Sequence, residues 1–273
     1  MSEKPSDENF PSGSLMAGKR GLVMGVANDH SIAWGIAKAL HAQGAELAFT
    51  FQGDAFGKRV KPLASSLGTD LVLPCDVEDA ASMDAVFDAL TRAWGQLDFV
   101  VHAIAYSDKE ELGGRYVDTT RKNFLRTLDI SCFSFTDVAR RAAPLMKEGG
   151  ALVTLTYLGA ERVVPSYNVM GVAKAALEAS VRYLAMDLGK DNIRVNAISA
   201  GPMRTLAGSA VSGARAMFNW NKKHAPLKHA VDLPDVGGAG LYLLSDLAAR
   251  VTGEVLHVDS GYNTLAIPDL NDL

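Results

Sequence analysis

A tyrosine and a lysine seven positions apart are the residues of this chain whose types and spacing most readily suggest chemistry. Tyr167 and Lys174 follow the apolar run 151–156 and open a segment with helical periodicity. Seven residues make two helical turns, so both side chains lie on one face, roughly 10 Å apart along the axis. A phenol can donate a hydrogen bond to a carbonyl oxygen as negative charge grows on it. A nearby ammonium can hold ribose hydroxyls and stabilise the same anion.

The pair alone does not establish an active site. Tyr and Lys occur at this spacing by chance, most often as the edge of a core and a solvated aliphatic stem. Further signals are therefore needed elsewhere in the chain.

A second candidate site lies near the N-terminus. The apolar run 21–26 contains Gly25, and a polar loop then leads to Ser31, where a helical pattern begins. Glycine at a strand end lets the backbone approach a pyrophosphate, and free N–H groups at a helix N-terminus favour an anion. The Ser31 hydroxyl could cap the helix and also reach a phosphate. Because the string G-x-G-x-x-G is absent, a plain strand–helix turn with a serine cap remains the alternative.

The next two strand ends bear on which dinucleotide would bind. An acidic residue after the second strand would hold a ribose 2′-hydroxyl, and an Arg or Lys would hold a 2′-phosphate. Here the run 45–51 ends at the neutral Gln52, and the nearest bases are Lys58 and Arg59. This favours NAD(H) over NADP(H). After the third strand, Asp76 is placed to meet the adenine, or to cap a helix.

Strand-like and helix-like patterns alternate along nearly the whole chain, which predicts a parallel sheet with helices on both faces. Ligands of such folds bind at the carboxyl ends of the strands, where both candidate sites fall. We therefore expect an α/β fold with a single Rossmann-type, doubly wound, parallel seven-stranded sheet. The expected strands are 21–26, 45–51, 71–74, 97–103, 151–156, 194–199 and 254–258; the expected helices are 32–40, 55–67, 83–94, 120–146, 168–188 and 236–244.

Two segments depart from this alternation. Residues 1–17 are expected to form a disordered N-terminal tail before a single NAD-binding catalytic domain, 18–273. Residues about 202–226 are too long for an ordinary connection and are predicted to be a substrate-binding loop.

The composition limits the possible functions. The 273 residues carry a formal net charge of −4, and 48% are hydrophobic. No basic face is evident, so nucleic acid is not an expected partner. No apolar run is long enough to span a membrane and no signal peptide is recognisable, so we expect a cytoplasmic protein. Cys75 and Cys132 are expected to be reduced thiols, and the scattered histidines suggest no metal site.

Three long segments carry a family resemblance that is more specific than any single motif. They resemble bacterial NADH-dependent enoyl-acyl-carrier-protein reductases of the short-chain dehydrogenase/reductase superfamily, a likeness that extends from about Gly18 to Gly261. Ordinary short-chain dehydrogenases carry Tyr-x3-Lys, but position 170 is Met170 and the spacing here is Tyr-x6-Lys. The three segments are GVANDHSIAWGIA (25–37), YLGAERVVPSYNVMGVAK (157–174) and IRVNAISAGPMRT (193–205).

The resemblance implies roles for individual residues. Tyr167 would bond the thioester carbonyl, Lys174 would bind the nicotinamide ribose, and Tyr157 would line the acyl pocket, so these three form the expected catalytic set. The expected cofactor contacts are Gly25, Ser31, Ile32, Gln52, Asp76, Val77, Ile104, Lys174 and Thr205. The expected substrate contacts are Ala105, Tyr157, Tyr167, Leu206, Met217 and Phe218.

Ala105 departs from the family, in which many members carry Gly there, and its methyl group would narrow the pocket slightly.

The implied activity is the enoyl reduction of type II fatty acid biosynthesis, with NADH as the hydride donor. The implied partners are an acyl carrier protein thioester and further copies of the chain in a homotetramer. Two alternatives stay open at this point. One is a ketone or alcohol short-chain dehydrogenase, and the other is a catalytically idle protein that senses NAD.

Overall fold

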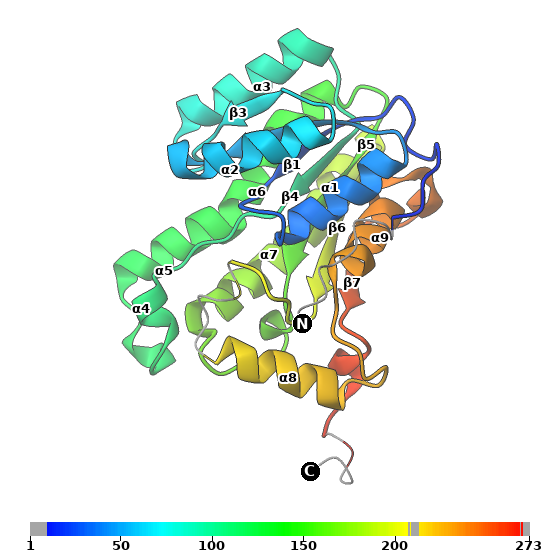
Figure 1. Ribbon diagram of the computed structural model, residues 1–273. Helices are drawn as coiled ribbons and strands as arrows, with labels where there is room; N and C mark the ends of the chain where they lie inside the picture. The colour runs from blue at the N-terminus through cyan, green and yellow to red at the C-terminus, as the bar shows by residue number, and fades with distance from the viewer. Residues whose placement is uncertain (1–9, 207, 209–212, 268, 270–273) are drawn as a thin grey trace.

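The computed structural model describes residues 10–206, 208, 213–267 and 269 of the chain. Its centre is a seven-stranded sheet in the order β3-β2-β1-β4-β5-β6-β7, in which every neighbouring pair is parallel (Figure 1). The order reverses between β1 and β4, which is the point where open α/β sheets bind ligands. The strands are β1 Arg20–Met24, β2 Glu46–Phe51, β3 Val72–Pro74, β4 Phe99–His102, β5 Gly150–Thr156, β6 Ile193–Ala200 and β7 Val255–Val258.

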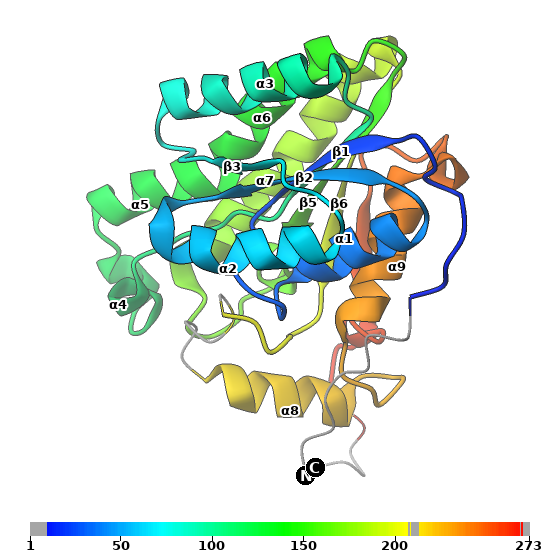
Figure 2. The ribbon, with the colours of Figure 1, turned by 45° about the horizontal axis from the view of Figure 1, so that its top comes forward.

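Helices cover both faces of the sheet, and this confirms the doubly wound prediction (Figure 2). Buried side chains of α1, α2 and α9 pack on one face, and those of α3, α6 and α7 pack on the other. The helices are α1 Ile32–Ala42, α2 Gly53–Ser66, α3 Ala80–Trp94, α4 Lys109–Leu112, α5 Arg121–Leu128, α6 Ser134–Ala142, α7 Asn168–Leu188, α8 Ala214–His224 and α9 Leu233–Leu244.

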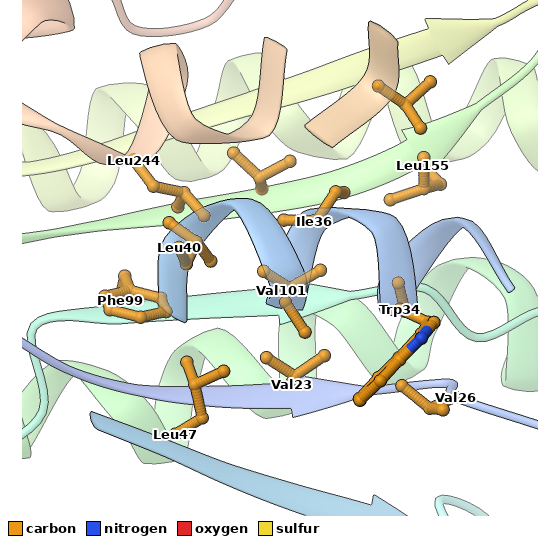
Figure 3. Close-up of a cluster of buried hydrophobic side chains, with 14 of the residues drawn as sticks. Val23, Val26, Trp34, Ile36, Leu40, Leu47, Phe99, Val101, Leu155 and Leu244 are labelled. Atoms are coloured by element: carbon orange, nitrogen blue, oxygen red, sulfur yellow. The ribbon is translucent and has the colours of Figure 1, made fainter. Parts of the chain in front are cut away.

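The helix α1 shows how the apolar periodicity builds one of these layers. Trp34, Ile36 and Leu40 of α1 belong to the same buried cluster as Val23 of β1 and Val101 of β4, and Ile36 lies on the side of the helix that faces α9 (Figure 3). Each of these side chains is almost fully buried. Because burial of a large apolar side chain stabilises by about 1.5–3 kcal/mol, this packing holds α1 against the sheet.

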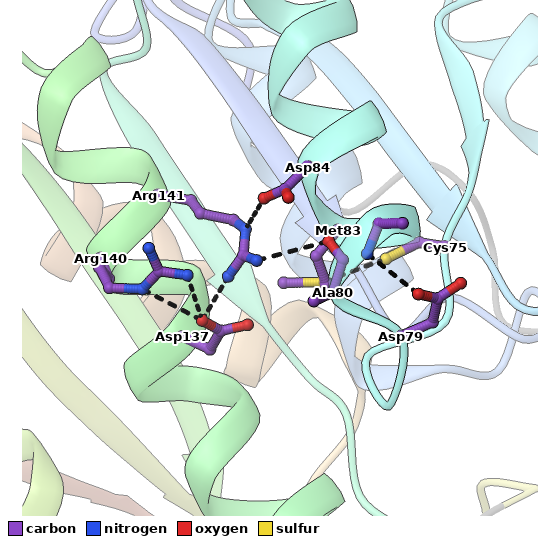
Figure 4. A network of polar contacts seen from close by, with 9 residues as sticks. Cys75, Asp79, Ala80, Met83, Asp84, Asp137, Arg140 and Arg141 are labelled. Carbon is purple, nitrogen blue, oxygen red and sulfur yellow. Dashed lines mark hydrogen bonds and ion pairs between the residues drawn. The ribbon is translucent and has the colours of Figure 1, made fainter.

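Polar side chains tie two helices of the opposite layer to each other. Arg141 of α6 donates to Asp84 of α3 at 2.8 Å and also pairs with Asp137 of its own helix (Figure 4). Beside this network, the thiol of Cys75 is buried against Met83. Burial raises the pKa of Cys75 to about 12, so the thiol stays protonated and unreactive.

Cys75 and Cys132 are both free, as predicted, although Cys132 is only half-buried.

The predicted helix 120–146 is interrupted in the structure. A π-helical segment, Asp129–Phe133, separates α5 from α6, and a 3₁₀ turn, Ala143–Leu145, ends the run. Apolar spacing cannot reveal such an insertion, because the hydrogen-bond ladder shifts by one residue while the buried face is kept.

The prediction of a disordered tail was wrong for residues 10–17. Residues 10–17 of the predicted disordered tail pack on the end of α1: Met16 is 1% exposed, and the N–H of Gly13 donates to Ala42 at 3.0 Å. Residues 1–9 of that tail lie outside the described residues. The predicted substrate-binding loop, about 202–226, is partly helical because it contains α8, and its residues 207 and 209–212 lie outside the described residues. The buried side chains of α8 are the polar Asn221 and His224, so hydrophobic periodicity does not reveal this helix.

Candidate active site

Two tyrosine rings meet beyond the carboxyl end of β5. Tyr157 directly follows the strand, and Tyr167 is the residue before α7. Their ring centroids lie 5.1 Å apart with an interplanar angle of 76°, an edge-to-face contact. A Cβ added at Gly159 would lie 2.4 Å from Cδ1 of Tyr167, so only glycine leaves room for the second ring.

The backbone that places Tyr167 is unusual. Ser166 and Asn168, on either side of it, have positive φ angles of 62° and 40°. Such conformations cost free energy in a residue with a side chain and persist where surrounding contacts impose them. The amide of Asn168 donates to the carbonyl of Leu112 at 3.0 Å, which is one of those contacts. The position of the phenol is therefore fixed by its neighbours.

Lys174 lies on the inner side of α7, and its side chain is buried. Its ammonium donates to the carbonyl oxygen of Leu155 in β5 at 2.7 Å. Burial lowers the pKa of Lys174 to about 8, while the nearby Cys132 and Glu178 oppose that fall. Lys174 is thus charged at neutral pH but loses its charge under mildly alkaline conditions.

The two phenols stay protonated over the same range. Burial raises the pKa of Tyr157 to about 12, and burial also raises the pKa of Tyr167, with smaller contributions from Tyr157 and Glu178. Both groups are therefore hydrogen-bond donors at neutral pH. They can stabilise a growing negative charge but cannot act there as bases.

His102, at the end of β4, lies beneath this site. Its Nδ1 and Nε2 atoms are hydrogen-bonded to Thr154 and Ser134 at 3.1 and 2.9 Å. Burial, and then the charge of Lys174, lower the pKa of His102 to about 3. The ring is neutral and adds no charge beside Lys174.

The loop after β1 differs in detail from its prediction. Gly25 has a φ of 97°, and a Cβ there would lie 2.1 Å from the carbonyl oxygen of Ala103. The neighbouring backbone by itself therefore requires glycine at position 25, whether or not a ligand is bound there. The Ser31 hydroxyl accepts from the N–H groups of Ala27 and Asn28 at 3.0 and 3.1 Å. The prediction that it caps α1 was wrong, because its oxygen is used to fold the loop.

The ends of β2 and β3 meet as expected. The amide of Gln52 donates to the carboxylate of Asp76 at 3.1 Å, so two predicted adenosine contacts lie side by side. The alternative that Asp76 caps a helix was wrong, since Asp79 caps α3 by accepting from the N–H of Ala81 at 2.9 Å. Asp76 instead accepts from the N–H of Glu78.

Other predicted contacts lie around the same edge of the sheet. Val77 and Ile104 are half-buried and pack against the α3–α6–α7 layer, with Ile104 directly beyond β4. Ala105 is exposed. The hydroxyl of Ser131, in the π-helical segment, bonds both backbone groups of Tyr106 and so holds this loop, a role that no motif signals.

The helix α8 extends beyond the end of β6, separate from the two helical layers (Figures 1 and 2). The indole N–H of Trp220 donates to the hydroxyl of Tyr262 at 3.0 Å and anchors the helix. Asn221, a buried side chain that the sequence did not suggest, lines a small cavity together with Tyr157.

The remaining predicted contacts lie in α8 or in the segment before it: Thr205 for the cofactor, and Leu206, Met217 and Phe218 for the substrate. Thr205 accepts from the N–H of Gly208 at 2.9 Å within its own loop, and Leu206 is exposed. Met217 is half-buried, and the guanidinium of Arg204 lies over the ring of Phe218, 4.6 Å from its centroid. The structure thus places the rings of Tyr157 and Tyr167 in contact and bonds Lys174 to the strand that ends beside Tyr157.

The described residues, 10–206, 208, 213–267 and 269, contain neither a metal-binding cluster nor a membrane-spanning helix. No cluster of three or more His, Cys, Asp or Glu side chains there is arranged to hold a metal ion. Within the same ranges, no helix is both long and apolar enough to cross a bilayer.

Comparisons with known proteins point to one family. A family model described as enoyl-(acyl carrier protein) reductase matches residues 25–263. The chain is 67% identical over 259 residues to enoyl-[acyl-carrier-protein] reductase [NADH] 2 of Rhizobium meliloti strain 1021, covering 95% of this chain and 97% of the relative.

Solved structures agree with these sequence comparisons. The reductase of Anaplasma phagocytophilum, crystallised with NAD, is 60% identical with a TM-score of 0.92, covering 96% of this chain and all of that one (100%). The reductase of Bacillus cereus, crystallised with NADP+ and an indole naphthyridinone, is 50% identical with a TM-score of 0.91, covering 93% and 100%.

Proposed function

The chain belongs to the family of NADH-dependent enoyl-[acyl-carrier-protein] reductases, and from that premise we propose how its residues carry out the family reaction. The protein reduces the trans-2 double bond of an enoyl thioester in type II fatty acid biosynthesis. The observation that supports the residue roles best is the ring contact of Tyr157 and Tyr167 directly after β5, with the buried ammonium of Lys174 bonded to Leu155 of the same strand.

The residues along the carboxyl edge of the sheet fit a dinucleotide. The N-terminus of α1 offers N–H groups to the pyrophosphate, with Gly25, Ser31 and Ile32 around it. The bonded pair Gln52 and Asp76 holds the adenosine, next to Val77. The nicotinamide end is held by Ile104, Lys174 and Thr205. When bound, NADH supplies the hydride that adds to the β-carbon of the enoyl thioester.

The protein contributes orientation and charge stabilisation. The phenol of Tyr167 donates to the thioester oxygen, where negative charge grows as the enolate forms. The Lys174 ammonium binds ribose hydroxyls and adds a favourable field at that oxygen. Tyr157 packs its ring edge-to-face with that of Tyr167 and lines the acyl pocket. The α8 segment, with Ala105, Leu206, Met217 and Phe218, supplies apolar surface for the acyl chain.

The proposed partners are an acyl carrier protein that presents the thioester and three further copies of the chain. Large exposed apolar side chains support a homotetramer. They are Leu125 of α5, Phe133 of the π-helical segment, and Tyr183 and Met186 of α7. Gly171 of α7 packs within the subunit and not on this exposed surface, since an added Cβ there would lie 2.7 Å from the carbonyl oxygen of Gly159. The free cysteines suit a reducing, cytoplasmic environment.

Met170 argues against a ketone or alcohol dehydrogenase. It stands where such enzymes carry their tyrosine, and its side chain is buried against Ser131. No phenol is thus available at that position.

The deciding assay follows the absorbance of NADH with crotonyl-CoA, beside acetoacetyl-CoA and NADPH controls. Oxidation of NADH with crotonyl-CoA alone is the expected result. Turnover of acetoacetyl-CoA alone would assign the chain to the ketone reductases. Binding of NADH without turnover of either thioester, or of a longer acyl-carrier-protein substrate, would favour the idle NAD-sensing protein.

A further inference from the structure

Glu178 is a buried carboxyl group to which the roles above assign nothing. It lies on α7, one helical turn after Lys174, and the two residues are 8% and 6% exposed. A buried charge is costly unless it is paired and hydrogen-bonded. An acid and a base spaced by four residues share one face of a helix.

Two hydrogen bonds fix these groups against the end of β5. The hydroxyl of Thr156 donates to Glu178 at 2.6 Å, and the ammonium of Lys174 donates to the carbonyl oxygen of Leu155 at 2.7 Å. Leu155 and Thr156 are consecutive residues of the strand. The strand therefore sets the positions of both the carboxyl and the ammonium group.

The ammonium of Lys174 has few charged neighbours. Burial lowers the pKa of Lys174, and the groups that oppose this effect are Cys132 of the π-helical segment and Glu178 of the same helix. His102 of β4 also faces Lys174, but it is neutral at physiological pH. A negative charge on Glu178 thus stabilises the charged form of the lysine.

Glu178 has several ionisable neighbours of its own. Burial raises its pKa, and Glu161 of the turn after β5 adds to the rise. The hydrogen bond from the Thr156 hydroxyl lowers the pKa of Glu178, and so do the charges of His257 of β7 and Arg182 of α7. His257 in turn bonds Glu161 at 2.8 Å, which offsets part of that repulsion. We take the carboxyl group to be ionised in the alkaline range where Lys174 titrates.

We propose that Glu178 is a positioning residue for the reaction, whose carboxylate, held by Thr156, keeps the ammonium of Lys174 charged and in place to bind the cofactor ribose. This inference rests on the role proposed above for Lys174. Glu178 touches neither substrate nor cofactor and acts only through the lysine.

The test is a pH series of NADH binding, followed by the fluorescence of the reduced nicotinamide. NADH affinity of the native protein is expected to be full at pH 6–7 and to fall with a midpoint near pH 8, as Lys174 loses its proton. Glu178→Gln keeps the size of the side chain and removes its charge. The midpoint of the fall should then move down by about 1 pH unit. Binding should be about fivefold weaker at the original midpoint and about tenfold weaker one pH unit or more above it.

Three variants separate this role from a structural one. Glu178→Asp keeps the charge, so its midpoint should lie close to that of the native protein. Asp187→Asn removes a carboxylate from the exposed side of the same helix and should leave the midpoint unchanged. Thr156→Val removes the 2.6 Å hydrogen bond and should shift the midpoint in the same direction, by less.

An unchanged midpoint in Glu178→Gln, or equal weakening at every pH in the Gln and Asp variants, overturns the inference. If Glu178→Gln does not fold, an unchanged midpoint in Thr156→Val does so instead. A native protein whose NADH affinity has no alkaline midpoint overturns the role of Lys174 as well. Because the readout is NADH binding, failure here is distinguishable from a failure to turn over enoyl thioesters.

Discussion

Replacing Gly159 by alanine should lower the catalytic rate, although no catalytic residue is itself substituted. The new Cβ would lie 2.4 Å from Cδ1 and 2.8 Å from Cε1 of Tyr167, about 1 Å short of ordinary van der Waals contact. The ring of Tyr157 lies on another side, 3.5 Å from the same Cβ. The Tyr167 ring must therefore shift, by roughly 1 Å, and overpacking of this kind costs about 1–3 kcal/mol.

A shift of about 1 Å at a catalytic group can lower the rate by about 100-fold. We therefore expect Gly159→Ala to reduce kcat by roughly that factor, measured as NADH oxidation with crotonyl-CoA. NADH affinity should change little, because Tyr167 is assigned to the thioester and not to the cofactor.

The matched control is Gly189→Ala, directly after the C-terminal end of α7. Gly189 has a φ of −60°, and an added Cβ there meets nothing within 4 Å. This variant should retain native activity and stability. Native kcat in Gly159→Ala would refute the reasoning, because it would show that the phenol is not held in a unique position or is not needed. A loss of NADH affinity as large as the loss in kcat would also contradict it.

Three further predictions follow from the site. Tyr167→Phe should lower kcat about 100- to 1000-fold while NADH affinity stays native, and unchanged turnover would exclude the assigned role. Lys174→Ala should weaken NADH binding at least about tenfold, which a fluorescence titration measures; a native titration curve would count against the ribose contact. Gln52→Arg should shift preference from NADH toward NADPH, in the ratio of kcat/KM values, and no shift would mean that position 52 does not face the ribose.

Most of the sheet was predictable from local pattern. Strands buried on both faces must be nearly continuous apolar runs, and all seven expected strands occur within a few residues of their predicted ends. The helix α7 begins and ends at the predicted residues, 168 and 188, because its apolar residues recur at helical spacing and a non-helical turn precedes it.

Parts of the fold that depend on buried polar groups were not predictable. The helix α8 buries Asn221 and His224, and the π-helical segment changes the ladder without changing the buried face. Local sequence also suggested a ligand-based reason for Gly25, although the carbonyl of Ala103, which follows the neighbouring strand β4 and is remote in sequence, is what excludes a side chain there.

The sequence by itself determined the fold class, the tyrosine and lysine two helical turns apart, and the neutral residue at the end of β2. These depend on spacing along one element, which the chain encodes directly. Only the tertiary structure decided that Gly159 makes room for the ring of Tyr167, that Gln52 bonds Asp76, and that Glu178 lies buried against Thr156. Each of these contacts joins different elements, and their meeting depends on how the elements pack together rather than on spacing along any one of them.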